Sequence, residues 1–284
     1  MTTSRIDPNP AAGAHAHPRR DPEGPRRSWT DPTLGTSPRR LARIAGLLYL
    51  VIFVSALFSE LVVRQRLIEP GDAAATAEAI AGSEWLFRAG FLADLVAFSA
   101  DVATGVLIYI LLRPVSRTLA LVATGFRLVQ SAVLGINLLN HLMAVVILND
   151  AADLGAFDEG QIDDLVLLSL SAHTYGYLIA LVFFAIHLLI VGHLVWRSGF
   201  LPRALGALLA LAGVGYLADS LMFFLIPGYD GAASPVVLAP AIVAEAGLIL
   251  WLLIKGVDVP RWRERSLAGG AQAPAGTGIP AGIR

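Results

Sequence analysis

The sequence contains no cysteine and a single lysine, Lys255, and only 15% of its 284 residues are charged. Without cysteine the chain has no disulfide, no thiolate metal ligand and no cysteine nucleophile. Its formal net charge of −1 lacks the basic surplus that nucleic-acid binding requires, so we expect no nucleic-acid partner. Hydrophobic residues, in contrast, make up 56% of the chain. This composition excludes an ordinary water-soluble domain and predicts a membrane protein.

Six apolar stretches are each long enough to cross the roughly 30 Å hydrocarbon core of a bilayer as a helix. They are continuously apolar, whereas the strands of a membrane barrel alternate between apolar and polar residues. The sequence therefore predicts an all-α fold, a polytopic transmembrane helical bundle with the lipid bilayer as its partner. We place the six spans at 44–63, 86–112, 118–148, 164–196, 203–226 and 235–254.

The two ends of the chain differ from the apolar part. Residues 1–40 are rich in Pro, Arg, Asp, Ser and Thr and have no apolar period, which predicts a disordered cytoplasmic tail. Residues 264–284 are rich in Gly, Ala and Pro, which predicts a flexible cytoplasmic tail. The segment between them, 41–263, is the predicted six-span membrane domain.

Basic residues outside the spans fall almost entirely on one side of the predicted bundle, in the two tails and the turns near 113–117 and 197–203. Arg64 and Arg66 are the exceptions, and the loops on their side are acidic. The positive-inside rule then places both termini in the cytoplasm, as expected for a multi-pass protein of the bacterial inner (plasma) membrane. In the first acidic loop, Asp72 precedes an alanine-rich stretch, which predicts a short capped helix lying as a lid on the bilayer surface.

Polar and ionisable side chains inside the predicted spans form the candidate site. Such groups are costly in a bilayer and usually face the bundle interior. Because span directions alternate, one group of them lies in the cytoplasmic half and another in the outer half. The candidate polar interior cluster comprises Asp94, Asp101, Arg127, Gln130, Asn137, His141, His173, Tyr177, His187, Asp219 and Glu245.

In the cytoplasmic half, the sequence predicts an ion pair between Arg127 and Asp101. Arg127 lies too deep for its side chain to reach water easily, and it does not lose its charge, so it needs an anion. The short turn 113–117 makes spans two and three adjacent, and Asp101 is the carboxylate nearest in depth. Gln130 and His187 are expected to complete the hydrogen bonding of Arg127.

Three interpretations apply to the polar residues of the outer half, which are Glu60, Asp94, His141, His173 and Asp219. They are hydrogen-bonding groups that join helices, or they line a polar cavity for a solute or protons, or His141 and His173 ligate a metal ion or haem. Paired imidazoles suit haem, and mixed imidazole and carboxylate ligands suit zinc, but no metal-binding spacing motif is present. We therefore predict no cofactor, with haem or zinc as the alternative.

The function that this pattern favours is that of a non-enzymatic membrane protein that binds or moves a small solute or protons through its polar interior. The alternative class is a membrane metal- or haem-dependent redox enzyme that uses intramembrane histidines. The sequence specifies no catalytic residue, no small-molecule ligand and no protein partner.

Seven short segments resemble one family of bacterial multi-pass membrane proteins, domain of unknown function 4386. The resemblance extends over residues 41–263 and leaves both tails outside. It implies a multi-pass helical membrane fold and carries no assigned activity, so it assigns no catalytic residue. The segments are RIAGLLY at 43–49, PGDAAAT at 70–76, LLRPV at 111–115, FRLVQ at 126–130, HTYGY at 173–177, SGFLPR at 198–203 and KGV at 255–257.

Overall fold

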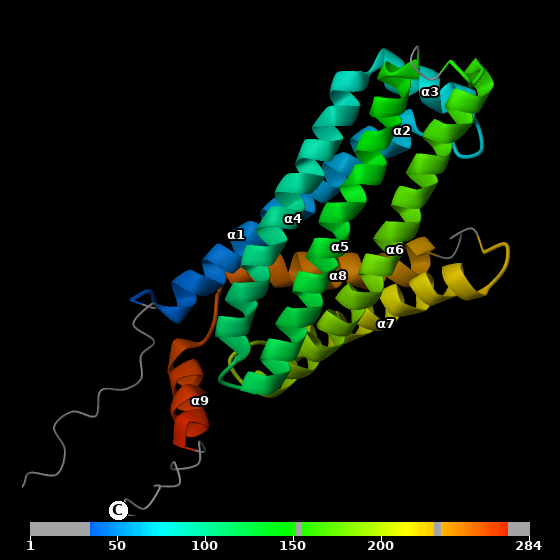
Figure 1. Ribbon diagram of the computed structural model, residues 1–284. Helices are drawn as coiled ribbons and strands as arrows, with labels where there is room; N and C mark the ends of the chain where they lie inside the picture. Colours follow the sequence, from blue (N-terminus) through cyan, green and yellow to red (C-terminus); the bar gives the residue numbers. More distant parts are fainter. Residues whose placement is uncertain (1–34, 152–154, 230–233, 272–284) are drawn as a thin grey trace, which may run out of the picture. The chain divides into compact units, whose positions relative to one another are not determined.

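A computed structural model describes residues 35–151, 155–229 and 234–271, which form helices and connecting turns with no strand among them (Figure 1). Residues 1–34 of the predicted tail 1–40 and residues 272–284 lie outside this description. The helices are α1 (Pro38–Leu57), the π-helix η1 (Phe58–Arg64), α2 (Gln65–Leu67), α3 (Ala73–Gly82), α4 (Glu84–Leu112), α5 (Arg117–Asn149), α6 (Glu159–Ser198), α7 (Arg203–Leu225), α8 (Ser234–Ile254) and α9 (Val259–Ala271).

Each predicted span corresponds to one long helical segment. Five segments are long and apolar enough to cross a membrane: the continuous helix Pro38–Leu67, which comprises α1, η1 and α2, and helices α4, α5, α6 and α7. The sixth, α8, contributes the shorter apolar stretch Ala239–Ile254. The predicted all-α transmembrane bundle is confirmed.

Local capping residues set where the helices begin. Ser37 precedes Pro38, the first residue of α1, and its Oγ accepts a hydrogen bond from the Arg40 amide at 3.3 Å. Asp158 and Gln161 form a capping box, in which each side chain accepts a hydrogen bond from the backbone N–H of the other residue at 3.0 Å. This box starts α6 at Glu159, five residues before the predicted boundary of 164.

The six long helices pack in chain order: α1 contacts α4, α4 contacts α5, and so on to α8, which packs back against α1. Figure 1 shows α4, α5 and α6 running side by side. Glycines let α6 and α7 approach closely, because a Cβ at Gly206 would lie 2.6 Å from the backbone nitrogen of Trp196. The helix order brings residues from α1, α4, α5 and α6 to a common interior.

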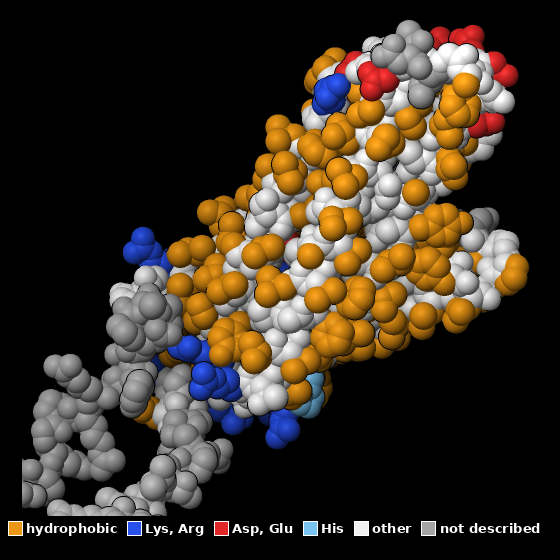
Figure 2. Space-filling model, in the orientation of Figure 1, with side chains coloured by type: hydrophobic (Ala, Val, Ile, Leu, Met, Phe, Trp, Pro, Cys, Tyr) orange, Lys and Arg blue, Asp and Glu red, His pale blue; other side chains and the backbone are white. Residues whose placement is uncertain are grey.

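One end of the bundle, which we call the acidic end, comprises the end of α2, helix α3 and the start of α4. Figure 2 shows Asp and Glu gathered there, beside a blue basic group, and most of the visible Lys and Arg at the opposite, basic end. The predicted helix after Asp72 is confirmed as α3, since the Asp72 side chain accepts from the Ala75 amide at 3.0 Å. Beneath α3, a cluster of buried apolar side chains closes this end of the bundle, among them Val63, Ile80, Phe87 and Val166.

The C-terminal segment differs from the prediction. Residues 264–271, predicted as the start of a flexible tail, belong to α9. The helix is capped by Asp258, whose Oδ1 accepts from the Arg261 amide at 3.2 Å. It is fixed to the end of α4 by Trp262, whose indole N–H donates to the Leu111 carbonyl at 2.9 Å. Composition alone did not reveal these two interactions.

Candidate functional site

The predicted polar residues separate into two buried groups inside the bundle. The first, the arginine cluster, comprises Tyr49, Asp101, Arg127, Ser131 and His187. The second, the histidine cluster, comprises Asp94, His141 and His173. Both groups draw their residues from several helices, so each depends on the folded bundle.

Arg127 of α5 is the centre of the arginine cluster, with its side chain 1% exposed. It forms the predicted ion pair with Asp101 of α4, and one of its Nη1 hydrogens is donated to the Tyr49 hydroxyl at 2.6 Å. The Ser131 hydroxyl donates to the second oxygen of Asp101 at 2.6 Å. Opposite charges and hydrogen bonds thus compensate one another in the membrane interior.

His187 completes this network as a neutral acceptor. Its Nε2 lies 3.1 Å from Nη1 of Arg127, and its Nδ1 lies 2.8 Å from the Ala123 carbonyl oxygen. A guanidinium only donates and a carbonyl only accepts, so Nδ1 carries the hydrogen and Nε2 has the free lone pair. We read the arginine cluster as a structural core that ties α1, α4, α5 and α6 together.

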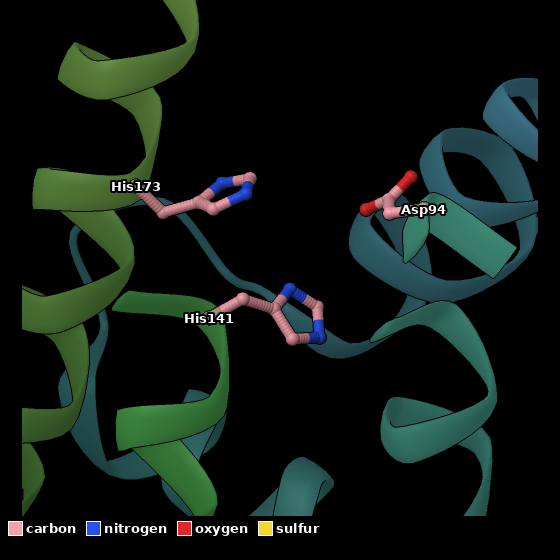
Figure 3. A group of neighbouring side chains, drawn as sticks. All are labelled: Asp94, His141 and His173. Carbon is pink, nitrogen blue, oxygen red and sulfur yellow. The ribbon is translucent and has the colours of Figure 1, made fainter. Parts of the chain in front are cut away.

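The histidine cluster joins α4, α5 and α6 nearer the acidic end. One ligand atom each from Asp94, His141 and His173 lies within 4.8 Å of the others, and all three residues are buried. Figure 3 shows the two imidazole rings on one side and the Asp94 carboxylate facing them. Two imidazoles and a carboxylate are a donor set that divalent transition metals prefer.

Both histidines of the cluster hold a buried ring nitrogen that has no hydrogen-bond partner: Nδ1 of His141 and Nε2 of His173. The other nitrogen of His141, Nε2, lies 3.3 Å from the Phe87 carbonyl oxygen and therefore carries the hydrogen. Nδ1 of His141 is then a bare lone pair. A ligating histidine commonly donates its second N–H to a carbonyl in this way.

Neighbouring groups hold the two rings in place. Phe87 stacks on His141 with ring centroids 4.1 Å apart, and the His173 ring meets His141 edge-on at 5.6 Å. Asn137 donates from Nδ2 to the His173 carbonyl at 2.7 Å. Gly176 leaves room for that amide, because a Cβ there would lie 2.2 Å from Asn137 Oδ1. The rings are therefore positioned before any ion binds.

Asp94 has a cationic partner that the sequence reasoning missed. Arg64, the last residue of η1, donates from Nη1 to Asp94 Oδ2 at 2.7 Å and from Nε to Glu60 Oε2 at 2.8 Å. The predicted first span ends at residue 63, which leaves Arg64 in a loop. Its position four residues after Glu60, on a helix that continues beyond residue 63, was the available signal.

Tyr49 and Ser131 were also missed, although both are polar side chains inside the predicted spans. The remaining predicted residues lie outside the two clusters. Tyr177 lies beside the His173 ring, with centroids 6.3 Å apart, and the Oε1 of Gln130 is buried without a partner instead of serving Arg127. Asp219 accepts from the Tyr229 hydroxyl at 2.7 Å, and Glu245 accepts from the Tyr216 hydroxyl at 2.9 Å.

Comparison with known proteins agrees with this architecture. The family model described as domain of unknown function 4386 matches residues 44–256. An uncharacterized protein of Archaeoglobus fulgidus is 33% identical over 156 residues, which cover 55% of this chain and 76% of that protein. No solved structure matches. The chain therefore belongs to the family of domain of unknown function 4386.

Proposed function

We propose that this membrane protein binds a divalent transition-metal ion, zinc in the first instance, inside its helical bundle through Asp94, His141 and His173. The observation that carries the proposal is the pair of buried imidazole nitrogens that lack a hydrogen-bond partner and lie beside a buried carboxylate. An unsatisfied buried polar atom is costly, and a metal ion satisfies both nitrogens at once.

The dimensions of the histidine cluster suit a metal ion. Zinc bonds nitrogen and oxygen at about 2.0–2.1 Å, so ligand atoms around it lie about 3.3 Å apart. The three candidate atoms lie within 4.8 Å of one another and need only a small inward movement. Three protein ligands leave a fourth position open, which is typical of sites where the ion or a bound water exchanges.

The same geometry favours an ion over the haem alternative. The rings of His141 and His173 are in edge contact, with centroids 5.6 Å apart, which leaves no space for a macrocycle between them. Phe87 covers another side of the His141 ring. We therefore propose that the small solute expected in the polar interior is a metal ion.

Zinc titration of the purified protein tests the proposal. After treatment with a chelator, equilibrium dialysis in detergent is expected to give one zinc per chain for the wild type. His173→Ala removes one of three ligands and is expected to weaken zinc binding about 100-fold or more. His193→Ala is the matched control, because His193 lies on the same helix and is exposed. Equal binding by wild type and His173→Ala would overturn the proposal.

We also infer that the acidic end faces away from the cytoplasm and that both termini lie inside the cell, at the inner (plasma) membrane. The support is the separation of charge between the two ends of the bundle (Figure 2). Compartment-sensitive reporters fused at Asp158 and at the C-terminus are expected to report opposite sides of the membrane. Signals from the same side would contradict this topology.

A further inference from the structure

We infer that Arg64 is a built-in competitor of the metal ion, and that Arg64 and Glu60 together form the gate of the histidine cluster. This inference rests on the proposed metal site and assigns its regulation. In the structure, the guanidinium of Arg64 bridges two carboxylates: Nη1 lies 2.7 Å from Asp94 Oδ2, and Nε lies 2.8 Å from Glu60 Oε2.

The two carboxylates differ in their surroundings. The Asp94 side chain is 3% exposed, whereas that of Glu60 is 50% exposed. Arg64 itself is 14% exposed and lies between them. The guanidinium of Arg64 therefore joins an exposed carboxylate, that of Glu60, to a buried one, that of Asp94, which belongs to the histidine cluster.

A buried carboxylate needs a cation nearby, and Arg64 supplies it when no ion is bound. A divalent ion held by Asp94 and two neutral imidazoles takes over that role. Two cations at one carboxylate repel each other strongly where the surroundings are poor in water. The guanidinium is on a long flexible stem and already contacts Glu60, so it is the cation that can withdraw.

The backbone around Arg64 is built for this contact. The seven residues Phe58–Arg64 form a π-helix, a form often found at functional sites, and Ser59, Glu60 and Arg64 all belong to it. Arg64 Nη1 also donates to Ser59 Oγ at 3.0 Å, and Ser59 donates to the Gly90 carbonyl at 3.2 Å. Gly90 allows the approach, since a Cβ there would lie 2.8 Å from Val63 Cγ1.

The test compares zinc affinities of charge variants by equilibrium dialysis. Arg64→Gln removes the competitor and is expected to bind zinc about tenfold more tightly or better. Glu60→Gln removes the partner to which Arg64 withdraws and is expected to bind zinc several-fold more weakly. Because Glu60 acts through Arg64, Glu60→Gln is expected to have no further effect when Arg64 is already Gln.

The matched control is the pair Glu84 and Arg88, which has the same i, i+4 spacing at the same end of the bundle, with Arg88 Nε 2.6 Å from Glu84 Oε1. Arg88→Gln and Glu84→Gln measure the general effect of charge and are expected to change zinc affinity less than about twofold. If the Arg64→Gln chain does not fold without metal, Glu60→Gln and Arg64→Lys, which keeps the charge, still test the gate.

The outcomes separate this inference from the proposed function. If neither wild type nor any variant binds zinc, both fail. If wild type binds one zinc and Arg64→Gln binds no more tightly than Arg88→Gln, the gate fails and the metal site stands. If Glu60→Gln and Arg64→Gln act additively in the double variant, Glu60 does not act through Arg64, and the gate is again wrong.

Discussion

Replacing either partner of the buried Arg127–Asp101 pair with leucine is expected to lower the free energy of unfolding by about 3–5 kcal/mol. Each single change leaves one charge in the bundle interior without its counter-ion, since both side chains are almost fully buried. The double variant Asp101→Leu/Arg127→Leu removes both charges and is expected to lose much less. In that variant the Ser131 hydroxyl turns to the residue-127 carbonyl, which lies 2.9 Å from its Oγ, and His187 still faces the Ala123 carbonyl.

Unfolding in mixed detergent, followed by tryptophan fluorescence, measures these differences. The exposed pair Glu84 and Arg88 supplies the matched control, and its single and double leucine variants are expected to differ little from wild type. If the losses at Asp101 and Arg127 simply add in the double variant, the two residues are not energetic partners and the structural role of the arginine cluster is wrong.

Zinc is expected to stabilise the folded protein, because its three ligands come from α4, α5 and α6 and the unfolded chain does not hold them together. At a free zinc concentration about 100 times the dissociation constant, the gain is about 2.7 kcal/mol. The midpoint of thermal unfolding in detergent therefore rises with zinc concentration. His141→Ala and His173→Ala are expected to shift the rise to about 100-fold higher zinc concentrations, and His193→Ala to leave it unchanged. An equal rise in all four proteins would place zinc elsewhere.

Most of the bundle was predictable because hydrophobicity and length decide which segments span a membrane. The Arg127–Asp101 pair was also predictable, since depth within adjacent antiparallel spans limits the anions that a buried arginine reaches. His187 was expected beside Arg127 for the same reason and lies there. Both predictions depend only on the depth of each residue along its helix axis.

The remaining details depend on rotation about the helix axis, which apolar spans of nearly uniform hydrophobicity do not specify. Gln130 was expected to contact Arg127, but Tyr49 and Ser131 take part in the cluster instead. The predicted loop position of Arg64 is wrong, because the first helix continues beyond residue 63 to Leu67. The π-helix at Phe58–Arg64 changes the direction in which each of its side chains leaves the helix axis. No pattern in the sequence predicted this π-helix.

X-ray absorption at the zinc edge of the zinc-loaded wild-type protein tests the metal site most directly. The account predicts a first shell of nitrogen and oxygen at about 2.0–2.1 Å with the outer-shell signature of two imidazoles. In His173→Ala loaded at higher zinc, the imidazole signature is expected to fall to one. A shell without imidazole scattering, or one unchanged by this substitution, would contradict a site formed by Asp94, His141 and His173.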